Sequence, residues 1–336
     1  MSNPIDALLA ERGVLLADGA TGTNLFEMGL AAGEAPELLN AADPDKIVAL
    51  HQGFIDAGAD IILTNSFGGT RHRLKLHNAQ DRVHELNKAA AEIARGVADS
   101  AGRTVIVAGS VGPTGELLEP LGAMTYAQAV EAFVEQIEGL KAGGADVAWI
   151  ETMSAPDEIR AAAEAAIRVG LPYTYTASFD TAGRSMMGLH PKDIHDVAAG
   201  LAQSPVAVGA NCGVGASDIL SSLLDMTAAA PEATVVVKGN CGIPEFRGAE
   251  IYYSGTPELM GDYARLAVDA GAKIIGGCCG TSFVHLRAMR DAIDGHVKSV
   301  RPSVADVITR IGPMRNKPAN ESGSGGERRE RRRGRG

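Results

Sequence analysis

Two adjacent cysteines lie in a pattern that favours metal binding. Cys278 and Cys279 follow the apolar residues Ile274 and Ile275 and stand within the glycine-rich run 276–280. Neighbouring side chains of a strand point to opposite faces, so two such sulfurs reach one point only where the strand ends and the backbone turns. Glycine permits such a turn. A disulfide between neighbours would close a strained small ring, whereas two thiolates that converge on a soft metal ion are ordinary chemistry.

The two remaining cysteines can complete such a site. Cys212 and Cys241 each follow an apolar run and an asparagine, in two Asn-Cys-Gly sequences. Zinc suits thiolate ligands, and catalytic zinc sites usually have three protein ligands and one position open for substrate. We therefore expect Cys212, Cys278 and Cys279 to bind zinc. Cys241 is either a fourth ligand that substrate displaces or a small buried side chain.

Eight apolar runs that alternate with helical patterns would position these cysteines. The runs cover residues 14–17, 60–63, 104–108, 146–150, 173–179, 206–210, 234–238 and 273–275. Continuous apolar runs are typical of parallel strands that are buried on both faces. Eight βα units in 336 residues favour an α/β fold with a single-domain (βα)8 TIM barrel. A doubly wound sheet is the alternative, but no dinucleotide-binding glycine pattern follows the first run.

Helical spacing and end signals predict the intervening helices. The predicted helices cover residues 4–12, 44–57, 81–100, 125–142, 156–169, 191–203, 216–229 and 256–270. If Cys212 and Cys278 point into the barrel, strand alternation places Ala210 and Gly276 one layer below them, beside Trp149. We assign residues 1–315 to the barrel and residues 316–336 to a disordered, Arg-rich tail.

Charge and composition exclude several classes of protein. The net charge is −10, although the last ten residues contain six arginines and two glutamates. An acidic body disfavours nucleic-acid binding over the main surface, while the tail either contacts an acidic partner, RNA or membrane or only aids solubility. No run approaches the roughly 20 apolar residues of a membrane helix. With four cysteines and no recognisable signal peptide, we expect a cytoplasmic protein.

Polar residues stand where the predicted strands end. The C-terminal ends of barrel strands carry the chemistry of TIM-barrel enzymes, so these residues are candidates for substrate binding. Asp18 and Glu151 suit a substrate cation, and backbone N–H groups of a turn containing Gly19 suit a carboxylate. The candidate substrate contacts are Asp18, Gly19, Glu151, Thr152, Ser178 and Asn211.

Several motifs together resemble the zinc-dependent homocysteine S-methyltransferase family, which includes betaine-homocysteine methyltransferases and the homocysteine module of cobalamin-dependent methionine synthase. The motifs are DGATGTNL at 18–25, AGSVGPTG at 108–115, Glu151-Thr152, GANCG at 209–213 and GGCCGT at 276–281. The resemblance implies a (βα)8 barrel and zinc held by Cys212, Cys278 and Cys279. It also implies homocysteine as methyl acceptor, methionine as product, and Asp18 and Glu151 as partners of the substrate ammonium group.

The methyl donor and the class of protein have alternatives. Betaine is the favoured donor, although Gly68 and Gly69 follow Phe67 where the animal betaine enzymes have aromatic residues. The alternatives are S-methylmethionine and a separate cobalamin protein that would make this chain one subunit of a split methionine synthase. A lyase that uses Lys238 as a Schiff-base lysine and a non-catalytic zinc-binding or redox-sensing protein are the other classes.

Overall fold

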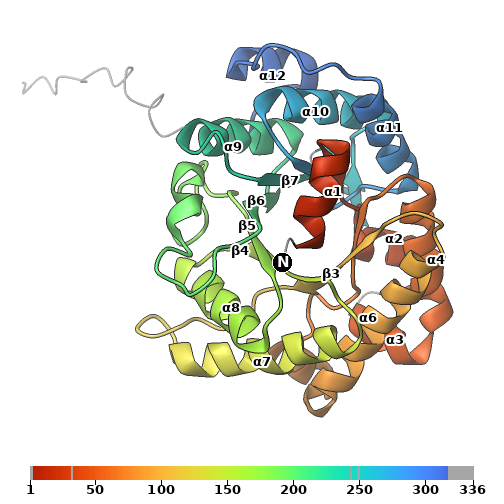
Figure 1. Cartoon of the computed structure of the whole chain (residues 1–336), viewed down its shortest axis with the longest axis vertical. Helices are drawn as coiled ribbons and strands as arrows, with labels where there is room; N and C mark the ends of the chain where they lie inside the picture. The colour runs from red at the N-terminus through yellow and green to blue at the C-terminus, as the bar shows by residue number, and fades with distance from the viewer. Residues whose placement is uncertain (1–2, 32, 243, 248–249, 317–336) are drawn as a thin grey trace, which may run out of the picture.

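The computed structural model describes residues 3–31, 33–242, 244–247 and 250–316. Eight parallel strands curl into a nearly closed barrel that helices surround, in one domain (Figure 1). Their order around the sheet is β1-β10-β7-β6-β5-β4-β3-β2. The strands are β1 (Leu15–Leu16), β2 (Ile61–Leu63), β3 (Ile106–Val111), β4 (Val147–Met153), β5 (Tyr173–Ala177), β6 (Ala207–Cys212), β7 (Val235–Gly239) and β10 (Ile274–Gly277). The predicted TIM barrel is confirmed.

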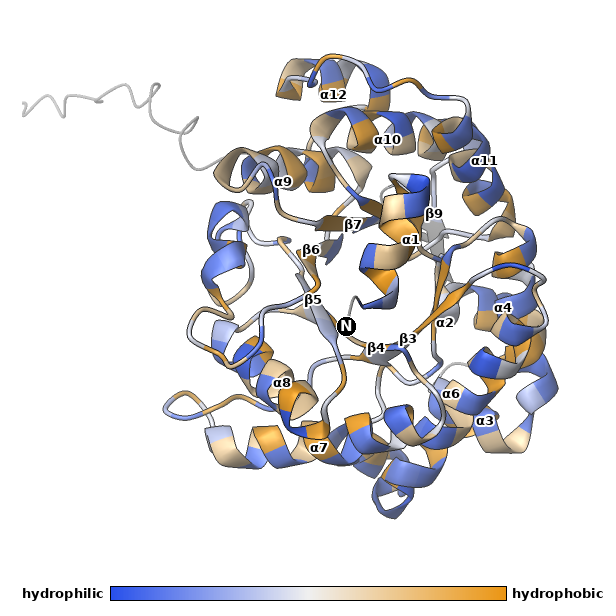
Figure 2. Ribbon diagram, viewed as in Figure 1, coloured by the Kyte–Doolittle hydropathy of each residue, from blue (hydrophilic) through white to orange (hydrophobic). Residues whose placement is uncertain are grey.

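The helices lie outside the barrel with their apolar faces toward the strands (Figure 2). They are α1 (Pro4–Arg12), α2 (Thr21–Glu27), α3 (Leu39–Ala42), α4 (Pro44–Asp56), α5 (Arg71–Leu74), α6 (Val83–Asp99), α7 (Tyr126–Ala142), α8 (Pro156–Val169), α9 (Ala216–Ala229), α10 (Pro257–Ala270), α11 (Phe283–Asp294) and α12 (Val304–Ile311). Four short 3-10 helices are η1 (Pro36–Leu38), η2 (Lys75–His77), η3 (Gln80–Arg82) and η4 (Pro191–Asp196). Helix α1 does not lie outside the barrel with the other helices. Its Ile5 and Leu8 pack against barrel-lining residues and close the N-terminal end of the barrel.

Most helix ends agree with the sequence signals. Thr125 and Gln128 form the expected capping box of α7, and Gly170 ends α8 in the left-handed conformation. The predicted helix over residues 191–203 is wrong, because only η4 forms there. Arg160 donates from α8 to the carbonyls of Val197 and Ala199, at 2.8 and 2.9 Å, and so occupies acceptors that a continuing helix would use.

Helices α2, α3, α5, α11 and α12 and one hairpin were absent from the expected pattern. A two-stranded antiparallel hairpin, β8 (Pro244–Arg247) and β9 (Glu250–Tyr253), follows β7. The prediction that Ala210 lies inside the barrel in one layer with Trp149 is also wrong. Trp149 belongs to the cluster that lines the barrel, whereas Ala210 packs in the outer cluster with the helices. Cys212 has φ +62°, so strand alternation cannot be extended through it, and Asn211 takes the inward position.

The barrel closes between β1 and β2, where the strands are short. The Asp60 amide donates to the Leu16 carbonyl at 2.6 Å, and the Asp18 amide donates to the Ile61 carbonyl at 3.0 Å. The two carboxylates complete this seam, since Asp60 accepts from the Leu16 amide at 2.9 Å and Asp18 accepts from the Leu63 amide at 2.7 Å. The two carboxylates thus replace hydrogen bonds that longer strands would form with each other.

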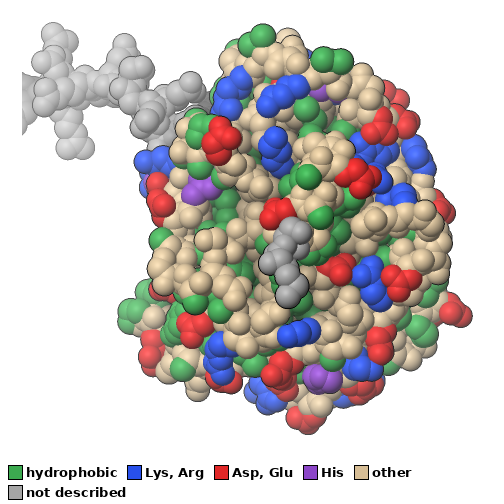
Figure 3. Space-filling model, in the orientation of Figure 1, with side chains coloured by type: hydrophobic (Ala, Val, Ile, Leu, Met, Phe, Trp, Pro, Cys, Tyr) green, Lys and Arg blue, Asp and Glu red, His purple; other side chains and the backbone are tan. Residues whose placement is uncertain are grey.

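Asp60 is also the centre of a buried ion cluster at the N-terminal end of the barrel. Its carboxylate lies 2.7 Å from Arg12, 3.1 Å from Arg290 and 3.6 Å from Arg103. Asp60 is fully buried, so these arginines stabilise its carboxylate in place of water. The cluster therefore ties α1 and α11 to the closing strand. The outer surface of the face that carries α1 has acidic and basic side chains mixed together (Figure 3).

The C-terminal segment packs against α9 as far as it is described. Ser217 donates to the Gly312 carbonyl at 2.8 Å, and Asp218 accepts from the Asn316 amide at 2.8 Å. Apart from residue 316, the predicted tail lies outside the described residues, so its disorder stays a prediction. Within the described part of the chain, no helix has the length and apolar character that crossing a membrane requires.

We expect Asp60→Asn to lower the free energy of unfolding by about 2 kcal/mol, because three partly buried arginines lose the fully buried carboxylate that they share. The matched control is Glu85→Gln on the exposed Arg82–Glu85 pair, which should cost about 0.5 kcal/mol. Urea denaturation of both variants measures the difference. Equal costs would contradict a central role for Asp60.

Candidate metal centre

Three cysteine side chains converge at the C-terminal end of the barrel. The sulfurs of Cys212, Cys278 and Cys279 all lie within 4.8 Å of one another, and those of Cys212 and Cys279 are 3.9 Å apart. Tetrahedral zinc with bonds of about 2.3 Å places its sulfur ligands ~3.8 Å apart. The cluster therefore has a spacing and a donor set that fit a thiophilic metal ion.

Two turns bring the cysteines together. Cys212 ends β6 with φ +62°, which is an uncommon conformation for a residue other than glycine. Beyond β10, the Cys278 amide donates to the Gly239 carbonyl at 2.8 Å, which continues the pairing with β7. Gly280, at φ +79°, then turns the chain, so both adjacent sulfurs face the same point.

Cys241 is not part of this cluster. Its buried sulfur donates weakly to the Gly255 carbonyl at 3.4 Å. Its amide donates to the Cys279 carbonyl at 2.8 Å, so the backbone of Cys241 supports the turn that carries Cys279. The backbone of Cys241 therefore supports the cluster, but its sulfur does not belong to the three-cysteine group. The sequence left open that Cys241 is a fourth ligand.

Asn211 links the cysteines to the end of β4. Its side-chain oxygen accepts from the Thr152 amide at 2.7 Å and from the Thr176 hydroxyl at 2.6 Å. Its side-chain nitrogen donates to the Thr152 hydroxyl at 2.7 Å and lies 3.8 Å from the Cys278 sulfur. Asn211 is buried and fully engaged, so it positions Thr152 and Cys278 rather than offering free groups to a substrate.

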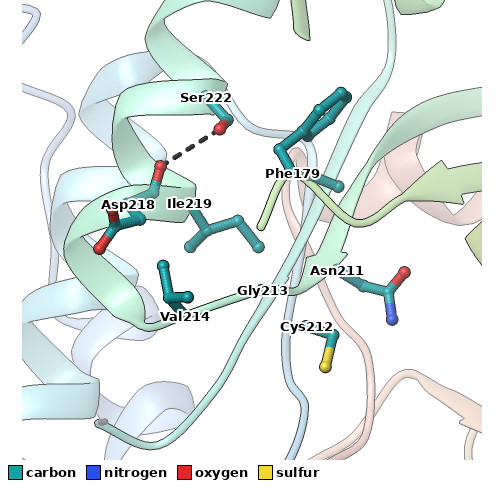
Figure 4. A pocket seen from close by; sticks show the side chains of 9 residues that line it. Phe179, Asn211, Cys212, Gly213, Val214, Asp218, Ile219 and Ser222 are labelled. Atoms are coloured by element: carbon teal, nitrogen blue, oxygen red, sulfur yellow. Dashed lines mark hydrogen bonds between the residues drawn. The ribbon is translucent and has the colours of Figure 1, made fainter. Parts of the chain in front are cut away.

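The side chains of Asn211 and Cys212 point away from α9 (Figure 4). The cavity between them and α9, which Val214, Asp218 and Ile219 also line, has a volume of about 10 Å³. This is the space of roughly one water molecule. This cavity therefore cannot hold a substrate the size of an amino acid.

Glu151 is a buried carboxylate at this end of the barrel. One of its oxygens accepts from the Ser110 hydroxyl at 2.5 Å. Burial raises the pKa of Glu151, against the opposing effects of the Lys238 ammonium and the Ser110 hydrogen bond. No hydrogen bond to its other oxygen is found among the described residues. Glu151 thus has an acceptor available for a cationic group.

Asp18, in contrast, is already paired. One oxygen accepts from the Lys238 ammonium at 2.7 Å and the other from the Leu63 amide at 2.7 Å. Burial lowers the pKa of Lys238, but the charges of Asp18 and Glu151 outweigh burial and raise it overall. A protonated lysine is a poor nucleophile, so this pairing disfavours the Schiff-base role considered for Lys238.

The other predicted substrate contacts differ in whether their polar groups are already hydrogen-bonded within the protein. Ser178 donates to Asp180 at 3.2 Å and makes no described hydrogen bond to the cysteines. Thr152 has φ +60° and is held by Asn211. Gly19 packs tightly, since a Cβ there would lie 2.6 Å from the Thr281 carbonyl oxygen. Its amide donates no hydrogen bond among the described residues, which leaves it free for a substrate carboxylate.

Three further residues of the site were not among the predicted substrate contacts. Ser110, the last residue but one of β3, orients Glu151, and Thr176 on β5 orients Asn211. Tyr253 on β9 packs against Gly280, and burial together with the neighbouring Cys279 raises the pKa of its hydroxyl. Ser110 stood among the polar strand ends. Nothing in the sequence pattern linked Tyr253 to the cysteines, because the hairpin that carries it was not predicted.

The three clustered thiols resist ionisation in the absence of a cation. Hydrogen bonding to Cys278 raises the pKa of Cys212 to about 12, and hydrogen bonding to Cys212 raises the pKa of Cys279 to about 11. The pKa of Cys278 is raised as well, since the opposing hydrogen bond with Cys212 is outweighed by Cys279 and by burial. A bound dication reverses this preference and makes thiolates stable.

Comparisons with known proteins agree on one family. The family model described as homocysteine S-methyltransferase matches residues 15–293. Methionine synthase of Mycobacterium tuberculosis is 31% identical over 330 residues, which cover 90% of this chain but 27% of that protein. The Mycobacterium leprae methionine synthase is also 31% identical and is covered to 27%. The chain thus spans about a quarter of the length of these relatives.

A solved structure covers almost the same extent as this chain. The metallated form of the Escherichia coli homocysteine methyltransferase MmuM superposes with a TM-score of 0.73 at 25% identity, over 86% of this chain and 99% of that one. Its oxidised form gives a TM-score of 0.72 at 26% identity, with the same coverage. The barrel of this chain therefore has the fold of nearly the whole solved homologue.

We expect metal binding at neutral pH to release about three protons, because all three thiols have raised pKa values and thiolates are the ligands. Isothermal titration calorimetry with zinc in buffers of different ionisation enthalpy counts these protons. By the same linkage, apparent affinity should fall as the pH is lowered. Zinc binding without proton release would contradict coordination by the three cysteines.

Proposed function

The chain belongs to the homocysteine S-methyltransferase family, and on this premise we propose that it transfers a methyl group to the thiol of homocysteine to form methionine. The observation that carries the proposal is the convergence of three cysteine sulfurs within 4.8 Å at the mouth of the barrel. No catalytic acid or base is needed in this scheme, because the acceptor thiolate is the nucleophile.

We propose zinc as the metal and Cys212, Cys278 and Cys279 as its protein ligands. The donor set supports this choice, since three thiolates and an open position are a recognised arrangement for catalytic zinc. When bound, zinc would lower the pKa of the acceptor thiol so that the sulfur is a thiolate at neutral pH. Asn211 supports the arrangement from behind by fixing Thr152 and lying against the Cys278 sulfur.

The acceptor's amino-acid end would bind near the ends of β1 and β4. The free oxygen of Glu151 would accept the ammonium group, while Ser110 holds the carboxylate in place. The amide of Gly19, which donates to none of the described residues, would bind the carboxylate. These contacts fix the chain of the acceptor at one end, so its thiol is directed toward the three cysteines.

For the donor, we propose betaine first. With zinc bound, three thiolates would leave the metal centre with a net negative charge, while the charge of Lys238 is balanced by Asp18. Such a site favours a donor that carries positive charge on the atom bearing the methyl group. The sulfur–carbon bond would form as the carbon–nitrogen bond breaks, which leaves a neutral amine. S-methylmethionine has the same charge pattern and is the closest alternative.

A second candidate rests on the methionine synthase relatives. The chain covers 27% of the Mycobacterium tuberculosis protein, which is 31% identical to it. A barrel that corresponds to one part of a larger enzyme suits the role of a homocysteine-activating subunit, with the methyl group delivered by a separate cobalamin protein. In that case small onium donors would be inactive.

Replacing one of the three cysteine ligands should remove metal binding and activity. We expect Cys212→Ala and Cys278→Ala to lose stoichiometric zinc and about two orders of magnitude or more of methionine formation, because the acceptor thiol stays protonated. Cys241→Ala is the matched control and should keep its zinc, since its sulfur lies outside the cluster. Metal analysis and a methionine assay read both effects. Full activity in zinc-free protein would refute the proposal.

The donor is tested with zinc-loaded protein and homocysteine. We expect methionine with betaine, because the negatively charged mouth favours an onium donor. S-methylmethionine and a methylcobalamin-loaded partner protein are supplied in parallel reactions, with Cys278→Ala as the blank. Turnover only with the cobalamin protein would favour the split methionine synthase instead.

A further inference from the structure

Tyr253 lies beside the cysteine cluster, yet the proposed reaction gives it no role. It is the last residue of β9 and is partly buried. Its side chain packs on the backbone of Gly280, where an added Cβ would lie 2.3 Å from the Tyr253 Cγ. Gly280 directly follows Cys279 and turns the chain at φ +79°. The tyrosine side chain therefore packs on the turn that positions Cys279, and only glycine leaves room for it there.

Backbone hydrogen bonds tie the end of β9 to the same turn. The Gly255 amide, two residues after Tyr253, donates to the Cys241 carbonyl at 3.1 Å. The Cys241 amide in turn donates to the Cys279 carbonyl at 2.8 Å. The Gly255 carbonyl also lies 3.2 Å from the His285 Nε2 of α11. These bonds fix the end of the hairpin relative to Cys279, so Tyr253 does not depend on its own side chain for its place.

The hydroxyl of Tyr253 hydrogen-bonds with the sulfur of Cys279. Burial raises the pKa of Tyr253, and Cys279 raises it further, so the phenol keeps its proton at neutral pH and is the donor. For Cys279, hydrogen bonding to Cys212 is the largest effect and raises the pKa, while Tyr253 acts in the opposite direction. The hydroxyl thus favours the thiolate of Cys279, which is the form that binds metal ions.

A second sulfur of the cluster also has a polar donor beside it. The side-chain nitrogen of Asn211, on β6, lies 3.8 Å from the Cys278 sulfur. Donors from β6 and β9 therefore lie against the two adjacent cysteines. Charged sulfur accepts hydrogen bonds more strongly than a neutral thiol does, so such donors suit thiolates. Groups of this kind fix the direction of metal ligands and tune their charge.

We propose that Tyr253 is a positioning residue of the metal centre, which donates a hydrogen bond to the metal-bound thiolate of Cys279. The inference rests on the proposed function, since it concerns the metal site of that reaction. The side chain holds the turn at Gly280, and the hydroxyl withdraws charge from one of three thiolates. Because the bond is stronger to a thiolate than to a thiol, it stabilises the metal-bound state more than the metal-free one.

The variant Tyr253→Phe tests the hydroxyl alone, because phenylalanine keeps the ring that packs on Gly280. We expect the dissociation constant for zinc to rise by about 10-fold, measured on the full chain by competition with a chromophoric chelator. In cobalt-substituted protein, the sulfur-to-metal charge-transfer band should move to longer wavelength, because a sulfur without its donor releases electrons more easily. Tyr126→Phe is the matched control, since that hydroxyl donates to Glu164 at 3.0 Å on the outer helices, and it should change neither readout.

A tyrosine that only packs would give a different result. Tyr253→Phe would then keep the zinc affinity and the charge-transfer band of the wild type, and this outcome would overturn the inference while leaving the proposed function intact. If the variant does not fold, a crystal structure of the zinc-loaded wild type decides instead. The hydroxyl should lie within hydrogen-bonding distance of the Cys279 sulfur, and a hydroxyl turned away from it would overturn the inference. A wild type that binds neither zinc nor cobalt would overturn the proposed metal site as well.

Discussion

The closure of the barrel between β1 and β2 is the constraint on which the site depends. The strands at this seam are two and three residues long, and the carboxylates of Asp18 and Asp60 replace hydrogen bonds that longer strands would supply. Only a closed barrel brings the ends of β1, β4, β6 and β10 around one mouth. Asp60 holds the N-terminal side of the seam, and Asp18 holds the side that faces the cysteines. The same kind of side chain therefore maintains the fold at one end and shapes the site at the other.

Local strain concentrates beside the cysteines. Cys212 and Thr152 both have left-handed backbone conformations, which cost about 1–3 kcal/mol each for residues other than glycine. The hydrogen bonds of Asn211 to Thr152 and Thr176 offset this cost. The turn at Cys212 directs its sulfur toward Cys279 instead of along the strand. The site is thus preorganised by buried contacts that a substrate does not touch, which is the arrangement that precise positioning of a reactive sulfur requires.

Much of the architecture could be predicted because its signals are local. Apolar runs identified the eight barrel strands, and the end signals of α7 and α8 placed those helices within a few residues. The region after residue 191 could not be predicted, because Arg160 from a distant helix competes for its carbonyls. The cysteine cluster was visible as a pattern of residue types, and its convergence follows from the parallel strands.

Tertiary pairing explains why the polar site was only partly predictable. Asp18 and Glu151 have similar places at the ends of their strands, so the sequence offers no reason to distinguish them. Their difference depends on Lys238, which reaches Asp18 across a third strand. Ala210 was placed on the wrong face because the alternation rule fails at a left-handed residue. Such effects arise from contacts between strands that are distant in sequence, and no local pattern encodes them.

The crossing of Lys238 over Gly276 has a consequence for substitutions at position 276. A methyl group at position 276 would meet both the lysine stem, at 2.9 Å, and Ala17, at 3.1 Å. A larger residue at 276 would therefore have to push aside the lysine stem or the end of β1. The two positions are coupled, so the side chain at 238 decides which residues position 276 tolerates.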